Sequence, residues 1–193
     1  MEWPITLAHG PLRLRALTRS DAASYAEVRR ANRDWLRPWE ATSPDPDYAL
    51  PDFKHLRRLL DRQARRGALL PLAMEVDGAF RGQLTVSGFQ WGSLRSAALG
   101  YWIDRRVAGQ GHTPVAVALA CDYCLFHLGL HRMEINIRPE NAASLRVVEK
   151  LGLRDEGLRR DYMHIDGAWA DHRSFAVTAE EVPGGLLPRA LGR

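Results

Sequence analysis

Alternation of apolar and polar side chains predicts a series of β-strands along the chain. Residues 12–17, Leu-Arg-Leu-Arg-Ala-Leu, alternate as a half-buried strand does. Residues 71–76 and 79–89 flank an Asp-Gly pair, an arrangement typical of a β-hairpin. The remaining strands are expected at 95–104, 131–138, 153–160 and 169–178. Strands therefore recur from the start of the chain to its end.

Apolar residues at helical spacing separate these strands. Residues 22–33 follow Thr-Arg-Ser-Asp, whose side chains offer capping oxygens, and Tyr25, Val28 and Trp35 are spaced for one helical face. Residues 52–66 form an amphipathic pattern that ends at a glycine. Two later helices are expected at 115–128 and 139–150. Because the first of these joins two strands, that strand pair is expected to run parallel.

Length and composition fit one domain. The chain has 193 residues, 46% of them hydrophobic, which suits a single domain of the usual ~100–200 residues. No apolar run approaches the ~18 residues that a membrane span needs, and residues 1–10 lack a signal-like pattern. We therefore expect a cytoplasmic protein with one domain at 1–181. Residues 182–193, rich in glycine and proline, are expected to form a flexible tail.

Residues 106–114, Arg-Val-Ala-Gly-Gln-Gly-His-Thr-Pro, join a predicted strand to the helix that follows it. The first N–H groups of a helix lack intrahelical partners and carry partial positive charge, so they attract anions. Gly109 and Gly111 allow left-handed backbone angles and close approach of a ligand, and Pro114 suits the first helical turn. The stretch therefore predicts a phosphate cradle, although such a turn can also be only a turn.

Two nucleotide-binding motifs are excluded for this stretch. It has neither the lysine nor the Ser/Thr of a Walker loop, and Pro114 stands where the third glycine of the dinucleotide fingerprint belongs. What remains is the pattern Arg-x-x-Gly-x-Gly.

The charge and the cysteines add little to this picture. The net charge is +4, which favours anionic partners such as phosphates or ribosomal RNA. The cysteines, Cys121 and Cys124, lie inside a predicted helix, away from the helix N-terminus that would lower a thiol pKa. Because no second pair completes a metal site, we expect no bound metal and interpret both as buried core thiols.

Several separated motifs occur in a recognisable order. They are Leu-Arg-Pro-Trp at 36–39, Gly-Tyr-Trp-Ile-Asp at 100–104, Leu-His-Arg-Met-Glu at 130–134, Arg-Pro-Glu-Asn-Ala-Ala-Ser at 138–144, Glu-Lys-Leu-Gly-Leu at 149–153 and Gly-x-Trp-x-Asp-His at 167–172. Together with the glycine stretch they resemble the RimJ/RimL branch of the GNAT N-acetyltransferases, over nearly the whole chain.

This resemblance implies a mixed α/β fold of the α+β class. In the GNAT fold a central, mostly antiparallel sheet is flanked by about four helices, and one parallel strand pair, here 95–104 and 131–138, splays apart. The family implies acetyl-CoA as the cofactor, with its pantetheine arm in the gap between these strands. The residues implied to bind the cofactor are Trp102, Ile103, Arg106, Val107, Ala108, Gly109, Gln110, Gly111, His112, Thr113, Asn141 and Ser144.

The resemblance also implies the reaction and the partners. RimJ-like enzymes acetylate the N-terminal α-amine of ribosomal proteins, so a protein N-terminus is the expected acceptor and association with the ribosome is expected. The protein is expected to be a monomer or a homodimer. Trp35, Trp39 and Tyr101 are expected to line the acceptor pocket. For the two tryptophans, which precede a loop containing Pro44 and Pro46, a local hydrophobic plug is the alternative.

Glu134 and Ser144 are the expected catalytic residues. Glu134 faces opposite Met133 on the strand that lines the gap, and its alternative is a structural ion pair with an arginine. Many family members have a tyrosine beside the thiolate where this chain has Val148, so Ser144 becomes the expected sulfur contact. Asn141 is expected to hydrogen-bond the pantetheine, to cap a helix, or to do both.

Other candidates for the base are weaker. Some relatives carry a glutamate base where this chain has Asn136, and Glu140 needs no catalytic explanation in the first turn of a helix. His164 and His172 can act as bases, but a lone histidine near a strand is more often structural. Because an α-amine has a pKa of roughly 7.7–8.0, against about 10.4 for lysine, a modest base suffices, even through water.

Two other functions stay open at this level. One is acetylation of a small amine, which favours an acidic pocket; no dense carboxylate cluster occurs at 35–48. The other is a sensor that binds acyl-CoA without catalysis, since Val148 removes the usual tyrosine.

Overall fold

The computed structural model describes residues 1–45, 47–49 and 51–192, so Pro46 of the proline-rich loop lies outside the described residues. Its centre is an eight-stranded sheet in the order β1-β2-β3-β4-β5-β6-β8-β7. The strands are β1 (Thr6–His9), β2 (Leu12–Arg15), β3 (Leu69–Val76), β4 (Ala79–Gln90), β5 (Ser96–Ile103), β6 (Arg132–Ile137), β7 (Arg154–Ile165) and β8 (Ala168–Thr178). All neighbouring strands are antiparallel except β5 and β6.

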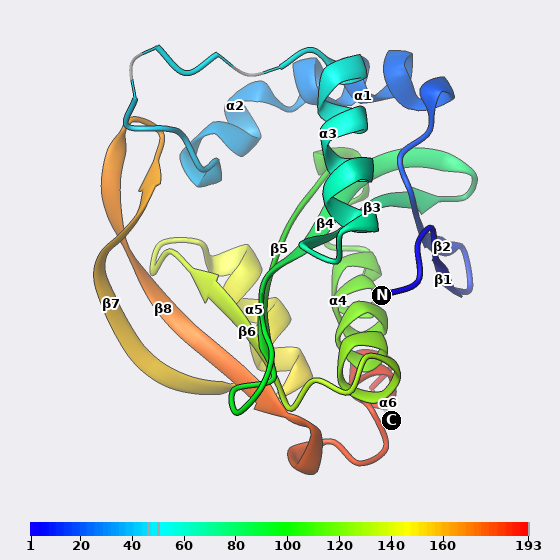
Figure 1. Ribbon diagram of the computed structural model, residues 1–193. Coiled ribbons are helices and arrows are strands. Elements are labelled where there is room, and N and C mark those ends of the chain that lie inside the picture. The colour runs from blue at the N-terminus through cyan, green and yellow to red at the C-terminus, as the bar shows by residue number, and fades with distance from the viewer. Residues whose placement is uncertain (46, 50, 193) are drawn as a thin grey trace.

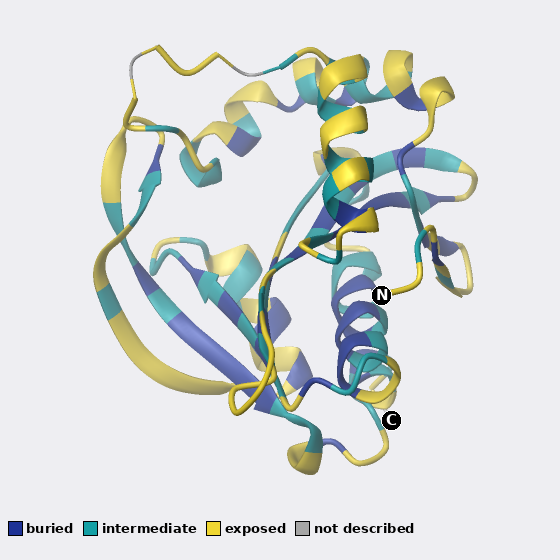
Figure 2. Cartoon of the chain, viewed as in Figure 1, coloured by how far each residue is buried: buried dark blue, intermediate teal, exposed yellow. Residues whose placement is uncertain are grey.

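Helices cover both faces of this sheet (Figure 1). They are α1 (Ala22–Ala31), α2 (Arg33–Leu36), α3 (Phe53–Arg65), α4 (His112–Asp122), α5 (Ala142–Leu151) and α6 (Leu187–Ala190). Alternate residues of β3 show the two faces: Leu72 belongs to the core cluster beneath α4 and α5, whereas Ala73 belongs to a smaller cluster with Val28 of α1. Figure 2 shows the buried inner side of α4 and the exposed outer side of α3.

The predicted strands and long helices are present, with shifts at their ends. On β6, Met133, Ile135 and Ile137 are buried, as their alternation predicts. The helix expected at 115–128 begins earlier, at His112, and continues from Tyr123 to His127 as a π-helical turn. Among the described residues, no helix is long and apolar enough to cross a membrane.

The parallel pair β5 and β6 splays apart. The two strands are paired only at Ser96–Arg132, Ala97–Met133 and Ala98–Glu134. Beyond these pairs β5 continues along β4 as far as Ile103, and β6 continues along β8 as far as Ile137. The diverging halves of the two strands therefore face each other without hydrogen bonds between them.

Two elements at the ends of the chain differ from the sequence prediction. Strand β1 was not expected, because at this sheet edge only Leu7 is partly buried and no alternation results. The expected tail at 182–193 is instead structured as far as it is described: Val182, Leu186 and Ala190 are buried against the main core. Asp122 of α4 holds the segment by accepting hydrogen bonds from the backbone N–H groups of Leu186 (2.6 Å) and Leu187 (3.1 Å).

A second link joins the loop after α2 to the β7–β8 turn. The backbone N–H of Thr42, in the loop after α2, donates to the carbonyl of His164 at 2.9 Å. Its hydroxyl lies 2.8 Å from Nδ1 of His164 and accepts from the N–H of Gly167 at 3.1 Å. In Figure 1 this loop reaches from α2 to the end of the β7–β8 hairpin.

Replacing a core residue of the C-terminal segment should destabilise the whole domain. Leu186 is fully buried, so Leu186→Ala should lower the free energy of unfolding by about 2–5 kcal/mol. The exposed Leu94, 60% accessible, is the control, since Leu94→Ala should change it by less than about 0.5 kcal/mol. Denaturant unfolding measures both; equal stability of the two variants would mean that the segment does not pack as described.

Candidate active site

A cavity of about 1010 Å³ occupies the place where β5 and β6 diverge. It reaches both sides of the sheet. On one side it is lined by Gln83, Thr85 and Ser87 of β4 and by residues of α1, α2 and α3; on the other it is lined by residues 140–144 at the start of α5. The glycine stretch before α4 contributes Ala108, Gly109, Gly111, Thr113 and Pro114. One continuous space therefore connects the expected phosphate cradle with the opposite face of the sheet.

A buried carboxylate fixes the chain where β5 ends and the glycine stretch begins. Asp104 is fully buried and accepts hydrogen bonds from Nε of Arg106 (2.8 Å), Nδ2 of Asn32 (3.0 Å) and Nη1 of Arg81 (3.2 Å). Burial alone would raise the pKa of Asp104, but the hydrogen bonds from Arg106 and Asn32 outweigh it and lower the pKa to about 2. Asn32 in turn accepts from the N–H of Arg105 at 2.8 Å. The entry to the cradle is therefore rigidly tied to the end of α1.

The cradle is shorter than the sequence predicted. The backbone N–H groups of Arg106, Val107 and Ala108 are already bonded within the turn, to Asp104 and Arg105. The guanidinium of Arg106 is occupied by Asp104 and by Glu27, which it contacts at 3.0 Å through both terminal nitrogens. These two ion pairs give Arg106 a structural role at the start of the glycine turn.

The next five N–H groups, at 109–113, have no hydrogen-bond acceptor among the residues that the structure describes. Gly109 has φ +77° and Gly111 has φ +87°, so both adopt the left-handed conformation that glycine allows. The side chain of Gln110 folds back and donates to the carbonyl of Arg106 at 3.1 Å. This row of unpaired amides at the start of α4 can bind a diphosphate.

The start of α5 lies across the gap from β5. Asn141 caps the helix, since its Oδ1 accepts from the N–H of Ser144 at 3.1 Å. Asn141 thus has the capping role that the sequence allowed, and the Nδ2 of its side-chain amide is left for other contacts. Val148 is 1% exposed and brings no polar group to this side. Ser144 and Tyr101 both line the cavity.

Tyr101 and Trp102 lie on opposite faces of the sheet. Neighbouring residues of a strand point to opposite sides. Tyr101 pairs with Leu84 and packs on the core beneath α4 and α5, whereas Trp102 packs with Tyr25 of α1. Both residues line the cavity, Trp102 from the side of α1 and α3 and Tyr101 from the side of α4 and α5.

Aromatic side chains form the wall of the cavity on the α1–α3 side. Trp35 and Trp39 both line it, as the acceptor-pocket interpretation predicted. Each is covered by an arginine: Arg105 lies 5.5 Å from the Trp35 ring centre, and Arg138 lies 5.8 Å from that of Trp39. The opening is therefore apolar in its walls and polar along β4.

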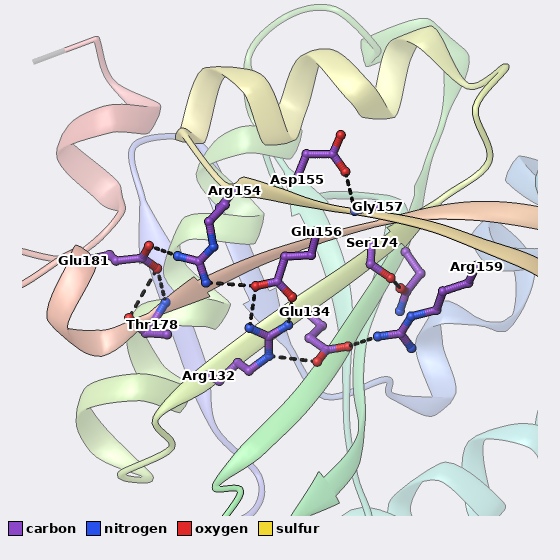
Figure 3. Close-up of polar contacts among 11 residues, drawn as sticks. Arg132, Glu134, Arg154, Asp155, Glu156, Gly157, Arg159, Ser174, Thr178 and Glu181 are labelled. Carbon is purple, nitrogen blue, oxygen red and sulfur yellow. Dashed lines mark hydrogen bonds and ion pairs between the residues drawn. The ribbon is translucent and has the colours of Figure 1, made fainter.

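Glu134 does not line this cavity. Its Oε1 accepts from Nε of Arg132 at 2.8 Å, and its Oε2 accepts from Arg159 of β7 at 3.1 Å. Arg132 also binds Glu156, so Glu134 belongs to a chain of ion pairs across β6 and β7 (Figure 3). In the sheet, Glu134 pairs with Ala98, which is the last residue pair between the parallel strands β5 and β6. This geometry favours the ion-paired alternative over the expected base.

The remaining acid–base candidates have structural contacts as well. His172 is buried and its Nδ1 donates to the carbonyl of Ala170 at 3.0 Å; burial lowers its pKa. His164 takes part in the contact with Thr42. Neither histidine lines the cavity. Glu140 does, and it lies 3.3 Å from Nε of Arg138.

The cysteines are confirmed as core residues. Cys121 and Cys124 are both buried and free. Burial raises the pKa of both thiols, to about 12 for Cys124. Such thiols stay protonated and are poor nucleophiles.

A cradle of amides before a helix and a splayed parallel strand pair are the structural features that the resemblance implied. The family model described as the acetyltransferase (GNAT) domain matches residues 11–154. The chain belongs to the GNAT acetyltransferase family.

Relatives of this GNAT acetyltransferase include enzymes that modify ribosomal proteins. The chain is 32% identical over 168 residues to "Probable N-acetyltransferase YjcK" of Bacillus subtilis, covering 85% of this chain and 92% of that protein. It is 29% identical over 168 residues to the [ribosomal protein uS5]-alanine N-acetyltransferase of Escherichia coli, covering 85% and 86%. The structure of Mycobacterium smegmatis RimJ in complex with CoA-disulfide superposes with a TM-score of 0.91 at 37% identity, covering 98% of this chain and 95% of that one.

Two parts of the GNAT site were not found by sequence reasoning. The tie between Asn32 and Asp104 joins residues that are far apart in the chain, and no local pattern indicates that a carboxylate there is buried. The polar row of Gln83, Thr85 and Ser87 was visible as alternation with Leu84 and Val86. That pattern indicates a strand with two different faces but not that one face lines a cavity.

Replacing Asp104 should change the acid stability of this GNAT domain. Its pKa is lower folded than unfolded, so the carboxylate stabilises the fold above about pH 4 and loses this contribution as the pH falls towards about 2. Asp104→Asn should therefore be less stable at neutral pH and should lose less stability over this acid range. Denaturant unfolding at several pH values measures the free energy of unfolding of wild type and variant, and the exposed Asp34→Asn is the control. Parallel curves for wild type and Asp104→Asn would contradict this role.

Proposed function

We propose that this GNAT acetyltransferase takes an acetyl group from acetyl-CoA and transfers it to the N-terminal α-amine of a protein, with a ribosomal protein as the acceptor. The proposal rests on one observation above all. A single cavity joins the unpaired amides at 109–113 to an opening with aromatic walls on the other face of the sheet. A cofactor held at one end can thus meet an acceptor that enters from the other.

The cofactor side suits a long thioester carrier. The N–H groups at 109–113 offer hydrogen bonds to its diphosphate. The diverging halves of β5 and β6 leave backbone groups without partners in the other strand, and these can pair with the amides of a pantetheine arm and polarise the thioester carbonyl. Asn141 and Ser144 stand at the side of this path.

The acceptor side does not favour a small polycationic amine. The acidic residues that line the cavity are Glu40 and Glu140. Each is matched by an arginine, Glu40 by Arg29 and Glu140 by Arg138. The cavity therefore offers no surplus of negative charge, and the relative that acts on ribosomal protein uS5 supports a protein acceptor.

An α-amine also needs the least help from a base. At pH 7 roughly a tenth of α-amines are neutral, against less than roughly a thousandth of lysine side chains. Among the described residues that line the cavity, the acidic ones are paired with arginines, so water-mediated loss of the proton fits the acceptor proposed. The net charge of +4 is compatible with work beside ribosomal RNA.

Peptide acceptors should separate the possible functions. With acetyl-CoA, peptides that begin with Ala, Ser or Thr should release coenzyme A above the hydrolysis background, and the same peptides blocked at the α-amine should not. Thiol release measures the rate, and mass spectrometry locates the acetyl group. Turnover confined to lysine side chains or small amines would refute the proposed acceptor. Tight binding of acetyl-CoA without any turnover would favour a sensor.

The cradle is tested by adding a side chain at Gly111. At φ +87° a β-branched residue is strained and its methyl groups enter the anion path, so Gly111→Val should weaken coenzyme A binding by about tenfold or more. Gly92, with φ +72° on an exposed turn outside the cavity, carries the same strain. Gly92→Val is therefore the matched control and should keep the wild-type affinity in calorimetry. Equal affinity of the two variants would argue against the cradle.

A further inference from the structure

Helix α3 carries more positive charge than the whole chain does. Residues 53–66, which are α3 and the residue that caps its C-terminal end, contain six cations and one carboxylate, a net charge of +5. The rest of the chain contains 21 cations and 22 acids. The cations of the helix are Lys54, Arg57, Arg58, Arg62, Arg65 and Arg66. The net charge of +4 therefore has one location in the fold.

The carboxylates at this helix are already bonded. Asp61 accepts from Nε1 of Trp3 at 2.9 Å and from Nε of Arg65 at 3.0 Å. Asp52, which precedes the helix, caps it by accepting from the N–H of His55 at 2.8 Å. Apart from Arg65, the cations of α3 have no carboxylate within ion-pair distance in the described part of the chain. Unpaired cations gathered in this way attract a polyanion.

These cations lie on the side of α3 that faces away from the sheet. Leu56 and Leu60 line the cavity and Ala64 is buried, so the apolar side of the helix faces inward. Figure 2 shows the outer side of α3 as exposed. Residues four apart on a helix are neighbours, about 6 Å apart along its axis. A row about 18 Å long therefore follows the outer side, and we call it the α3 basic face: Lys54, Arg58, Arg62 and Arg66, all exposed.

The composition of the α3 basic face fits a nucleic acid better than a protein. Between its cations, the exposed large apolar side chain is that of Leu59, 39% accessible. Protein interfaces have an apolar core with few charges, whereas nucleic-acid interfaces are polar and strongly positive. Three of the four cations are arginines, whose guanidinium groups bind phosphate through two parallel hydrogen bonds.

We propose that the α3 basic face binds the phosphate backbone of double-stranded RNA. The basic face itself does not depend on the proposed function, but the choice of RNA rests on it, because a ribosomal-protein acceptor is found beside RNA. The inner side of the same helix lines the opening expected for the acceptor, through Leu56 and Leu60. RNA held on the outer side thus keeps a bound acceptor near the site. Contacts to phosphates carry no sequence information, so the binding is independent of RNA sequence.

A triple variant tests the α3 basic face. Arg58→Gln, Arg62→Gln and Arg66→Gln together should weaken binding of an RNA duplex of about 20 base pairs by at least about tenfold at roughly 50 mM salt. The slope of log affinity against log salt should fall by about three, since each lost phosphate contact removes about one. Fluorescence anisotropy with labelled duplexes of two sequences measures both quantities, and the loss should be the same for both sequences.

A second triple variant is the matched control. Arg13, Arg19 and Arg160 are exposed and lie on β2, before α1 and on β7. Their replacement by glutamine lowers the net charge from +4 to +1, as the α3 variant does, yet it should change RNA affinity by less than about threefold because salt screens distant charges. Both variants should keep the wild-type melting temperature within a few degrees and the wild-type affinity for acetyl-CoA, since none of the six arginines lines the cavity.

The outcomes separate this proposal from the proposed function. Equal loss of RNA affinity in the two variants would mean that only net charge matters, and wild type that fails to bind RNA at roughly 50 mM salt would refute the proposal directly. A glutamate-rich peptide that binds wild type more tightly than the duplex would replace RNA with an acidic protein segment. If wild type acetylates peptides but does not bind RNA, only the proposed function stands. If RNA binds through α3 but acetyl-CoA does not bind, only the α3 basic face stands.

Discussion

Strands β5 and β6 are hydrogen-bonded to each other over only three residue pairs, from Ser96–Arg132 to Ala98–Glu134. Each strand then follows its other neighbour, β4 or β8, so the sheet stays continuous below the split and opens above it. A parallel pair interrupted in this way leaves polar backbone groups that need partners. The candidate active site occupies that opening, and the residues that line it come from both faces of the sheet.

Keeping the opening in place requires support on both sides. On the β5 side, buried Asp104 accepts hydrogen bonds from Arg106, Arg81 and Asn32, which connect the strand end and the glycine turn to the end of α1. On the β6 side, Arg132, Glu134 and their ion-pair partners bind β6 to β7 (Figure 3). Asp104, Arg106 and Glu134 thus hold the strands around the opening and do not line the cavity. The most visible charges in the motifs, Arg106 and Glu134, are both engaged in ion pairs within the protein.

Sequence reasoning succeeded where a local pattern has one structural solution. The alternation of Met133, Ile135 and Ile137 requires a strand with one buried face, and two glycines before an apolar helix produced the left-handed turn at 109–111. The family resemblance supplied the splayed pair, which no local periodicity encodes.

The remaining differences have tertiary causes. The segment at 182–190 has the composition of a loop, yet Asp122 and the core hold it in place. The direction of Tyr101 depends on the phase of β5 against β4, and a shift of one residue exchanges it with Trp102. The pairing of Glu134 depends on Arg159, which comes from a different strand. None of these contacts is encoded within a few residues of the position it affects.

A crystal structure of the protein with bound coenzyme A tests the central claim most directly. The account predicts the diphosphate against the N–H groups at 109–113 and the pantetheine arm between β5 and β6. Electron density for the diphosphate at another surface, or a protein segment filling the gap between the two strands, would contradict it.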